Sequence, residues 1–139
     1  MAEAAADYEA RIVRLAKFDV VVVKDEPLDH GTAKEVRQRE GDRILAASGG
    51  WTTIAFDRCG ELLSSEQLAA RLQKFEEQPP QKTAFVIGGA EGLDQRVLDA
   101  SSQQLAFGRI TLPHQLARVV VVEQVYRALT IMRGLPYHR

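Results

Sequence analysis

Cysteines, aromatic residues and long apolar runs are scarce in this sequence of 139 residues. Cys59 is the only cysteine, which excludes an internal disulfide and argues against a metal cluster. The histidines lack the spacing of metal ligands, and no segment is long and apolar enough to span a membrane. The first ten residues lack the basic and apolar segments of a signal peptide. We therefore expect a cytoplasmic protein with no metal and no membrane partner.

The formal net charge is only −1, but the charges are unevenly distributed. Residues 100–139 carry five arginines against Glu123 alone, which makes this part about +4, whereas residues 1–99 sum to −5. A basic segment is typical of a surface that faces phosphates. The pattern is equally consistent with solvated arginines on helix faces.

Helical and strand patterns alternate along the chain. Capping signals such as Thr32 with Glu35 and Ser64 with Gln67 mark helix starts, and Gly134 with Pro136 marks a helix end. The predicted helices lie at about 2–17, 32–48, 64–76, 94–102 and 115–133. The predicted strands are 19–24, which contains four consecutive valines, 51–56, 83–87 and 105–110. This alternation predicts one α/β domain, residues 1–139, with a mostly parallel sheet.

The glycines after the third strand are the first candidate binding feature. Gly88, Gly89 and Gly92 follow residues 83–87 directly. Ligands of parallel sheets bind beyond the carboxyl ends of strands, and glycine lets backbone approach a ligand closely. The segment is neither a P-loop nor a dinucleotide fingerprint. A tight strand-to-helix turn without a ligand explains these glycines as well.

Two further loops follow strands at the same expected edge of the sheet. Asp57 comes after residues 51–56, where a carboxylate can meet a ribose, although a single Asp in a turn is commonly a local cap. Residues 108–114 follow the fourth strand, and their backbone groups can read an adenine. The alternative for the second loop is a simple helix start, in which Pro113 presets φ.

The tail combines a phenol, an imidazole and a guanidinium in Tyr137, His138 and Arg139. Because Gly134 and Pro136 stop the preceding helix, we expect these residues to project from the fold. Such side chains suit base stacking, proton movement and phosphate contact. A frayed chain end is the alternative.

Several segments together resemble the ribosomal large-subunit methyltransferase H family, of the SPOUT class. The resemblance covers essentially the whole chain, and its motifs occur in family order. They are 37–45, Leu62-Leu63-Ser64-Ser65-Glu66, the glycine loop 85–93, Ile110-Thr111-Leu112-Pro113-His114, Arg118-Val119-Val120, 123–128 and Pro136-Tyr137-His138-Arg139.

The resemblance implies a deep trefoil knot in the C-terminal part, an arrangement nearly absent from other proteins. It implies that S-adenosylmethionine binds there in a bent shape. The implied contacts are Phe56, Asp57, the loop glycines Gly88, Gly89 and Gly92, and the run Gly108, Arg109, Ile110, Thr111, Leu112 and Pro113. It further implies a homodimer that methylates N3 of a pseudouridine in 23S rRNA of the assembled ribosome. Family members begin with a strand before the first helix, and this chain is expected to lack it.

For the chemistry, we assign proton movement to His138, base positioning to Tyr137 and stabilisation of the anion to Arg139 or Arg118. Two other readings stay open: a non-catalytic RNA- or ribosome-binding relative, and a SPOUT enzyme acting on a different RNA. The apolar run 119–122 makes the last helix apolar on more than one side, which favours a homodimer through that helix.

Overall fold

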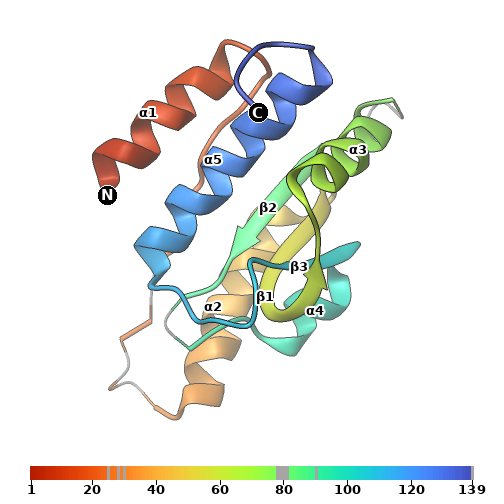
Figure 1. Ribbon diagram of the computed structural model, residues 1–139. Helices are drawn as coiled ribbons and strands as arrows, with labels where there is room; N and C mark the ends of the chain where they lie inside the picture. Colours follow the sequence, from red (N-terminus) through yellow and green to blue (C-terminus); the bar gives the residue numbers. More distant parts are fainter. Residues whose placement is uncertain (25, 28, 30, 78–81, 90, 139) are drawn as a thin grey trace. The chain divides into compact units, whose positions relative to one another are not determined.

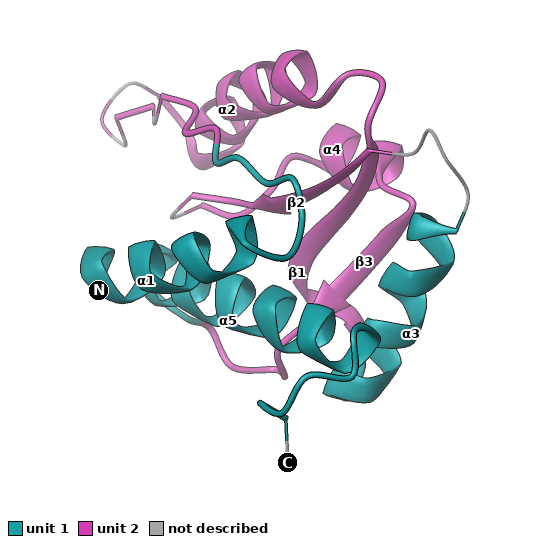
Figure 2. Cartoon of the chain, turned by 90° about the horizontal axis from the view of Figure 1, so that it is seen from above, with its two compact units in different colours: residues 1–20, 63–80, 112–139 teal, residues 21–62, 81–111 magenta. Residues whose placement is uncertain are grey.

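The structure is a computed structural model of the chain, and it describes all residues except 25, 28, 30, 78–81, 90 and 139. The contacts divide the chain into two compact units, shown in different colours in Figure 2. We call residues 1–20, 63–80 and 112–139 the helical unit, and residues 21–62 and 81–111 the sheet unit. Each unit combines segments that are far apart in the sequence.

The sheet unit contains three parallel strands in the order β2-β1-β3 (Figure 1). The strands are β1 (Thr52–Leu62), β2 (Thr83–Ile87) and β3 (Gln103–Ala106), and the helices are α2 (Ala33–Ser48) and α4 (Gln95–Ala100). Both helices, the two strands β1 and β2 and the loop after β2 contribute to one apolar core. Its buried residues are Ile44, Ala55, Val86, Leu93 and Val97.

Strand β1 contains an irregularity after Phe56. Leu105 of β3 pairs with both Phe56 and Glu61, so residues 57–60 are inserted relative to β3. A Cβ at Gly60 would lie 2.6 Å from the backbone carbon of Leu105, which only glycine avoids. The segment predicted as a loop after residue 56 is therefore part of a longer strand.

Asp94 and Arg96 join α4 to α2. Asp94 caps α4 by accepting a hydrogen bond from the backbone N of Arg96, and its Oδ2 also accepts one from the Nη2 of Arg96 at 2.5 Å. Nη1 of Arg96 donates to Oδ1 of Asp42 on α2 at 2.8 Å. Burial alone would raise the pKa of Asp94, but the hydrogen bonds from Arg96 outweigh it, and the pKa lies below its ordinary value.

The helical unit is built around α5 (His114–Met132), which packs against both α1 (Ala2–Val13) and α3 (Ser65–Glu76). Ile12 on α1 and Leu72 on α3 are buried, as are Val121 and Val125 on α5. Two packing partners account for apolar residues on more than one side of α5. The homodimer through this helix stays a prediction.

The helix starts predicted from capping patterns are confirmed. Ser64 and Gln67 form a reciprocal capping box at the start of α3. At the start of α2, Oγ1 of Thr32 accepts a hydrogen bond from the backbone N of Glu35 at 3.2 Å. These ends are correct because a cap is a local interaction that three or four neighbouring residues complete by themselves.

The strand predicted at residues 19–24 is wrong. The segment has no regular structure, and Val21 and Val22 are 69% and 78% exposed. A run of β-branched residues forms a strand only where a neighbouring strand is free to pair with it. The fourth strand is shorter than predicted and lies at 103–106, because the chain turns at Gly108, where φ is +138°. The α/β class and the parallel sheet are confirmed, and the knot and the missing first strand stay predictions.

Candidate functional site

The carboxyl ends of the three strands meet at one edge of the sheet unit. In the parallel register, Phe56 of β1 pairs with Ile87 of β2 and with Leu105 of β3. The segments that follow these residues, which start at Asp57, Gly88 and Phe107, therefore leave the sheet at the same edge. The sequence-based expectation that these loops share an edge is confirmed for the part that lies in the sheet unit.

Two of the loop glycines are required by the turn itself. Gly92 has a φ of +80°, and its backbone N donates to the carbonyl oxygen of Gly89 at 3.1 Å. A Cβ at Gly88 would lie 2.9 Å from the backbone carbon of Gly92, so the turn closes only without a side chain there. The turn explanation left open by the sequence thus accounts for Gly88 and Gly92, whether or not a ligand binds.

Gly89 has a different reason to be glycine. A Cβ there would lie 3.0 Å from Oε1 and 3.2 Å from Oε2 of Glu40, a residue of α2. The Glu40 side chain is buried, and its Oε2 accepts a hydrogen bond from the backbone N of Glu26 at 3.1 Å. Sequence reasoning missed Glu40, because it stands in a helix rich in charged residues where no local pattern distinguishes a buried carboxylate from exposed ones.

Phe56 belongs to a small aromatic group at this edge. Its ring stacks on that of Phe107, with centroids 4.9 Å apart and an angle of 10° between the planes, and the Phe85 ring lies 6.3 Å away. Phe107 remains 36% exposed. These rings offer a partly open apolar surface beside the glycine loop's strand.

Asp57 acts as a local cap, as the alternative reading predicted. Its Oδ2 accepts a hydrogen bond from the backbone N of Cys59 at 3.0 Å. This contact holds the inserted turn of β1 and gives the carboxylate a structural role in its present position.

The segment after β3 combines an open backbone with a held arginine. A Cβ at Gly108 would meet no atom within 4 Å. Nη1 of Arg109 donates to the carbonyl oxygen of Gly60 at 3.0 Å and also to that of Arg58. Ile110 is 69% exposed, which is unusual for an isoleucine. Thr111 is exposed at the end of the sheet unit.

Leu112 and Pro113, also predicted to bind the cofactor, belong to the helical unit. Pro113 occupies the position before the first residue of α5, with a φ of −56°. The reading of this residue as a helix start is confirmed. The structure brings the sheet-unit residues of the predicted site to one edge, and it describes these two separately from them.

The tail docks on the helical unit, so the prediction that it projects from the fold is wrong. Gly134, with a φ of +67°, turns the chain back after α5. The Tyr137 ring then packs edge-on against Tyr126 at 4.7 Å, and its hydroxyl donates to Oε1 of Glu123 at 3.2 Å. Its hydroxyl is also 3.2 Å from that of Tyr8. Burial, followed by the Tyr8 contact, raises the pKa of Tyr137.

Both ring nitrogens of His138 have partners in the helical unit. Nδ1 lies 3.1 Å from Nη1 of Arg127, and Nε2 lies 2.7 Å from Oε1 of Glu66. A guanidinium only donates hydrogen bonds, so Nδ1 is the acceptor and Nε2 carries the proton that Glu66 accepts. This hydrogen bond from His138 lowers the pKa of Glu66. Arg139 lies outside the described residues.

The arginines of the basic C-terminal part that the structure describes are engaged within their own units. Arg118 binds Oε1 of Glu9 at 2.7 Å through Nη2, Arg127 binds Oε1 of Glu123 at 2.6 Å, and Arg133 binds Glu76 at 3.2 Å. The hydrogen bond to Glu123 raises the pKa of Arg127. A phosphate would have to replace a carboxylate at each of these positions.

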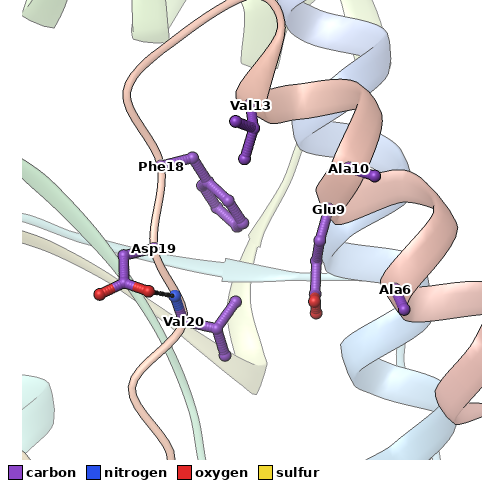
Figure 3. Close-up of a pocket in the computed structure, with 7 residues that line it drawn as sticks. All are labelled: Ala6, Glu9, Ala10, Val13, Phe18, Asp19 and Val20. Carbon is purple, nitrogen blue, oxygen red and sulfur yellow. Dashed lines mark hydrogen bonds between the residues drawn. The ribbon is translucent and has the colours of Figure 1, made fainter.

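A groove of about 300 Å³ lies between α1 and the segment that follows it (Figure 3). It is lined by Ala6, Glu9, Ala10, Val13, Phe18, Asp19 and Val20. None of the residues predicted from the sequence lines this groove. Its acidic groups are occupied, because Glu9 binds Arg118 and Asp19 accepts a hydrogen bond from the backbone N of Val20 at 2.8 Å.

In the described ranges, no helix is both long and apolar enough to cross a membrane. The same part of the chain contains no cluster of three or more His, Cys, Asp or Glu residues that could hold a metal ion.

Comparisons with known proteins agree with the resemblance noted from the motifs. The family described as "Predicted SPOUT methyltransferase" matches residues 1–138. A protein from Listeria welshimeri serovar 6b named "Ribosomal RNA large subunit methyltransferase H" is 48% identical over 139 residues, which cover 96% of this chain and 87% of the relative. A protein of the same name from Listeria monocytogenes serotype 4b is 45% identical with the same coverage. The family recognised from the sequence is confirmed.

Proposed function

The chain belongs to the SPOUT methyltransferase family, and we propose that it transfers a methyl group from S-adenosylmethionine to ribosomal RNA of the large subunit. The finer proposal is that the acceptor is N3 of a pseudouridine in 23S rRNA of the assembled ribosome, in the cytoplasm. The observation that carries both is the family match over residues 1–138, together with the name shared by the relatives.

The residues at the carboxyl edge of the sheet unit fit the methyl donor. Backbone at Gly92 and Gly108 is open on the side where a Cβ would stand, which lets a ligand approach closely. The exposed faces of Phe107 and Ile110 offer apolar surface for an adenosine. We assign donor binding to Phe56, Asp57, Gly88, Gly89, Gly92 and residues 108–113.

S-adenosylmethionine supplies a methyl group that its sulfonium has already activated. The work left to the protein is largely orientation of donor and acceptor, which can contribute a large part of the rate. The acceptor nitrogen is a weak acid, so a group that takes its proton also accelerates transfer.

We assign proton movement to Nδ1 of His138. The Nε2–H is held by Glu66, which leaves Nδ1 as the ring atom able to accept a proton once Arg127 turns away. The Glu66 carboxylate then stabilises the charged imidazole that results. Tyr137 positions the base, and Arg118 and Arg139 favour the anion; for Arg118 this requires release from Glu9.

We also propose that the active form is a homodimer with the C-terminal knot of its family. If each tail completes the partner's site, a mixed dimer of tail-deleted and Gly89→Val subunits regains one working site. Methyl transfer by the mixture, with none by either parent, supports this arrangement. A monomer in light scattering at high micromolar concentration contradicts it.

The test of the function is transfer of labelled methyl groups to ribosomes that lack the modification, followed by mass-spectrometric mapping of the modified nucleotide. Transfer to large-subunit rRNA is expected. The proposal fails if the folded protein binds the methyl donor and modifies neither ribosomes nor isolated rRNA.

Two variants test the tail. Deletion of residues 137–139 is expected to abolish transfer and leave donor affinity nearly unchanged. Because the tail packs on the helical unit, His138→Gln serves as the milder variant: it keeps a hydrogen-bonding side chain and cannot move a proton. We expect transfer to fall by about 100-fold or more. Full activity in His138→Gln would remove His138 from the mechanism.

A further inference from the structure

Glu40 is a buried acidic residue to which the proposed mechanism assigns no task. It is 7% exposed. One carboxylate oxygen, Oε2, accepts the hydrogen bond from the backbone N of Glu26. The other, Oε1, has no hydrogen-bond partner among the residues that the structure describes. Buried oxygens without a partner are rare in folded proteins and call for a specific explanation.

The unpartnered oxygen faces the glycine loop. A Cβ at Gly89 would lie 3.0 Å from Oε1, so the carboxylate occupies the space where a side chain at residue 89 would begin. Glu40 and Gly89 both belong to the sheet unit. Oε1 is therefore placed beside the loop to which we assign the methyl donor.

The charge of Glu40 is also uncompensated within the described part of the chain. The arginines on the same helix bind another carboxylate: Nη2 of Arg43 lies 2.7 Å from Oε2 of Glu26, and Nη1 of Arg39 lies 3.5 Å from Oε1 of Glu26. A buried carboxylate without a cation is costly to the folded state. A neutral hydroxyl donor would satisfy the hydrogen bond alone, whereas a cationic N–H donor satisfies both the hydrogen bond and the charge.

We propose that Oε1 of Glu40 accepts a hydrogen bond from the ammonium group of the amino-acid part of the bound methyl donor. This assignment rests on the proposed function. It makes Glu40 a ligand-binding residue that holds one end of the donor against Gly89. It also explains why a buried, uncompensated carboxylate is kept at this position: its partner arrives with the ligand.

The test compares two ligands by calorimetry. S-adenosylhomocysteine carries the ammonium group, and methylthioadenosine has the same nucleoside without the amino-acid part. Glu40→Gln keeps the shape of the side chain and an acceptor for the Glu26 N–H. We expect this variant to bind S-adenosylhomocysteine about tenfold more weakly and methylthioadenosine as the wild type does. The matched control is Glu35→Gln, which removes one exposed charge from the same helix and should change neither affinity.

Stability of the ligand-free protein separates this role from a merely structural one. Because Glu40→Gln removes an uncompensated buried charge, its unfolding temperature should equal or exceed that of the wild type. Unchanged affinity for S-adenosylhomocysteine, an equal loss for both ligands, or a lower unfolding temperature without ligand-selective loss would each overturn the assignment. If the wild type binds neither ligand, the proposed function falls together with it; if wild type and Glu40→Gln bind equally, only the Glu40 assignment falls.

Discussion

Replacing Gly41 by alanine should destabilise this protein, although the same change inside most helices does the opposite. Gly41 lies within α2, where alanine has a helix propensity more favourable by about 1 kcal/mol. At this position, however, a Cβ would lie 2.8 Å from Cβ and 2.9 Å from Oδ2 of Asp94. Cβ is attached directly to the backbone, so relief requires α2 or the start of α4 to move.

The size of the effect follows from two opposing contributions. Overpacking of this kind costs about 1–3 kcal/mol, and displacement of Asp94 weakens a helix cap worth about 1 kcal/mol. After the propensity gain of about 1 kcal/mol, the free energy of unfolding should fall by about 1–3 kcal/mol. For a chain of this length, that lowers the unfolding temperature by roughly 3–12 °C.

Thermal and urea unfolding of Gly41→Ala measure this change, with Gly49→Ala as the control. A Cβ at Gly49 would make only an ordinary contact, 3.6 Å from the Leu45 carbonyl oxygen, and its φ is −57°; we expect a change within about 0.5 kcal/mol. In an Asp94→Gly background the Gly41→Ala penalty should largely vanish, since the opposing Cβ is gone. A Gly41→Ala protein more stable than the wild type would refute the reasoning.

Three further predictions concern the site and its supports. Gly89→Val should abolish binding of S-adenosylmethionine in calorimetry and, by pressing on the Glu40 carboxylate, lower the unfolding temperature slightly; full affinity in a folded variant would exclude this loop from the site. Tyr137→Phe loses the hydroxyl contacts with Tyr8 and Glu123 and should reduce the free energy of unfolding by about 1 kcal/mol, whereas no change would mean that the tail is not docked in solution. The lowered pKa of Asp94 predicts stability that is complete above its unfolded pKa of 3.8 and is lost as the pH falls through the folded value; urea unfolding from pH 3 to 6 should show a shallower acid limb in Asp94→Asn, and identical limbs would contradict the assignment.

The features that local interactions decide were predictable from the sequence. The caps at Thr32 and Ser64, the turn glycines and the helix stop at Gly134 each depend on residues within one or two turns of one another. The shared carboxyl edge of the strands followed from the parallel α/β pattern. Family membership was accessible too, because several motifs in the right order identify a family more specifically than any one of them.

What the sequence by itself determined about this protein is therefore its class, its family and the loops that carry the candidate site. Only the tertiary structure decided that Val20–Val23 do not form a strand, because strand formation depends on a free neighbouring strand rather than on β propensity alone. It also decided that the tail docks through Tyr137 and His138, and that Glu40 stands against Gly89 with one oxygen unpaired. These contacts join residues at least 14 positions apart, and burial or pairing at such separations is set by how the elements pack, which no local pattern encodes.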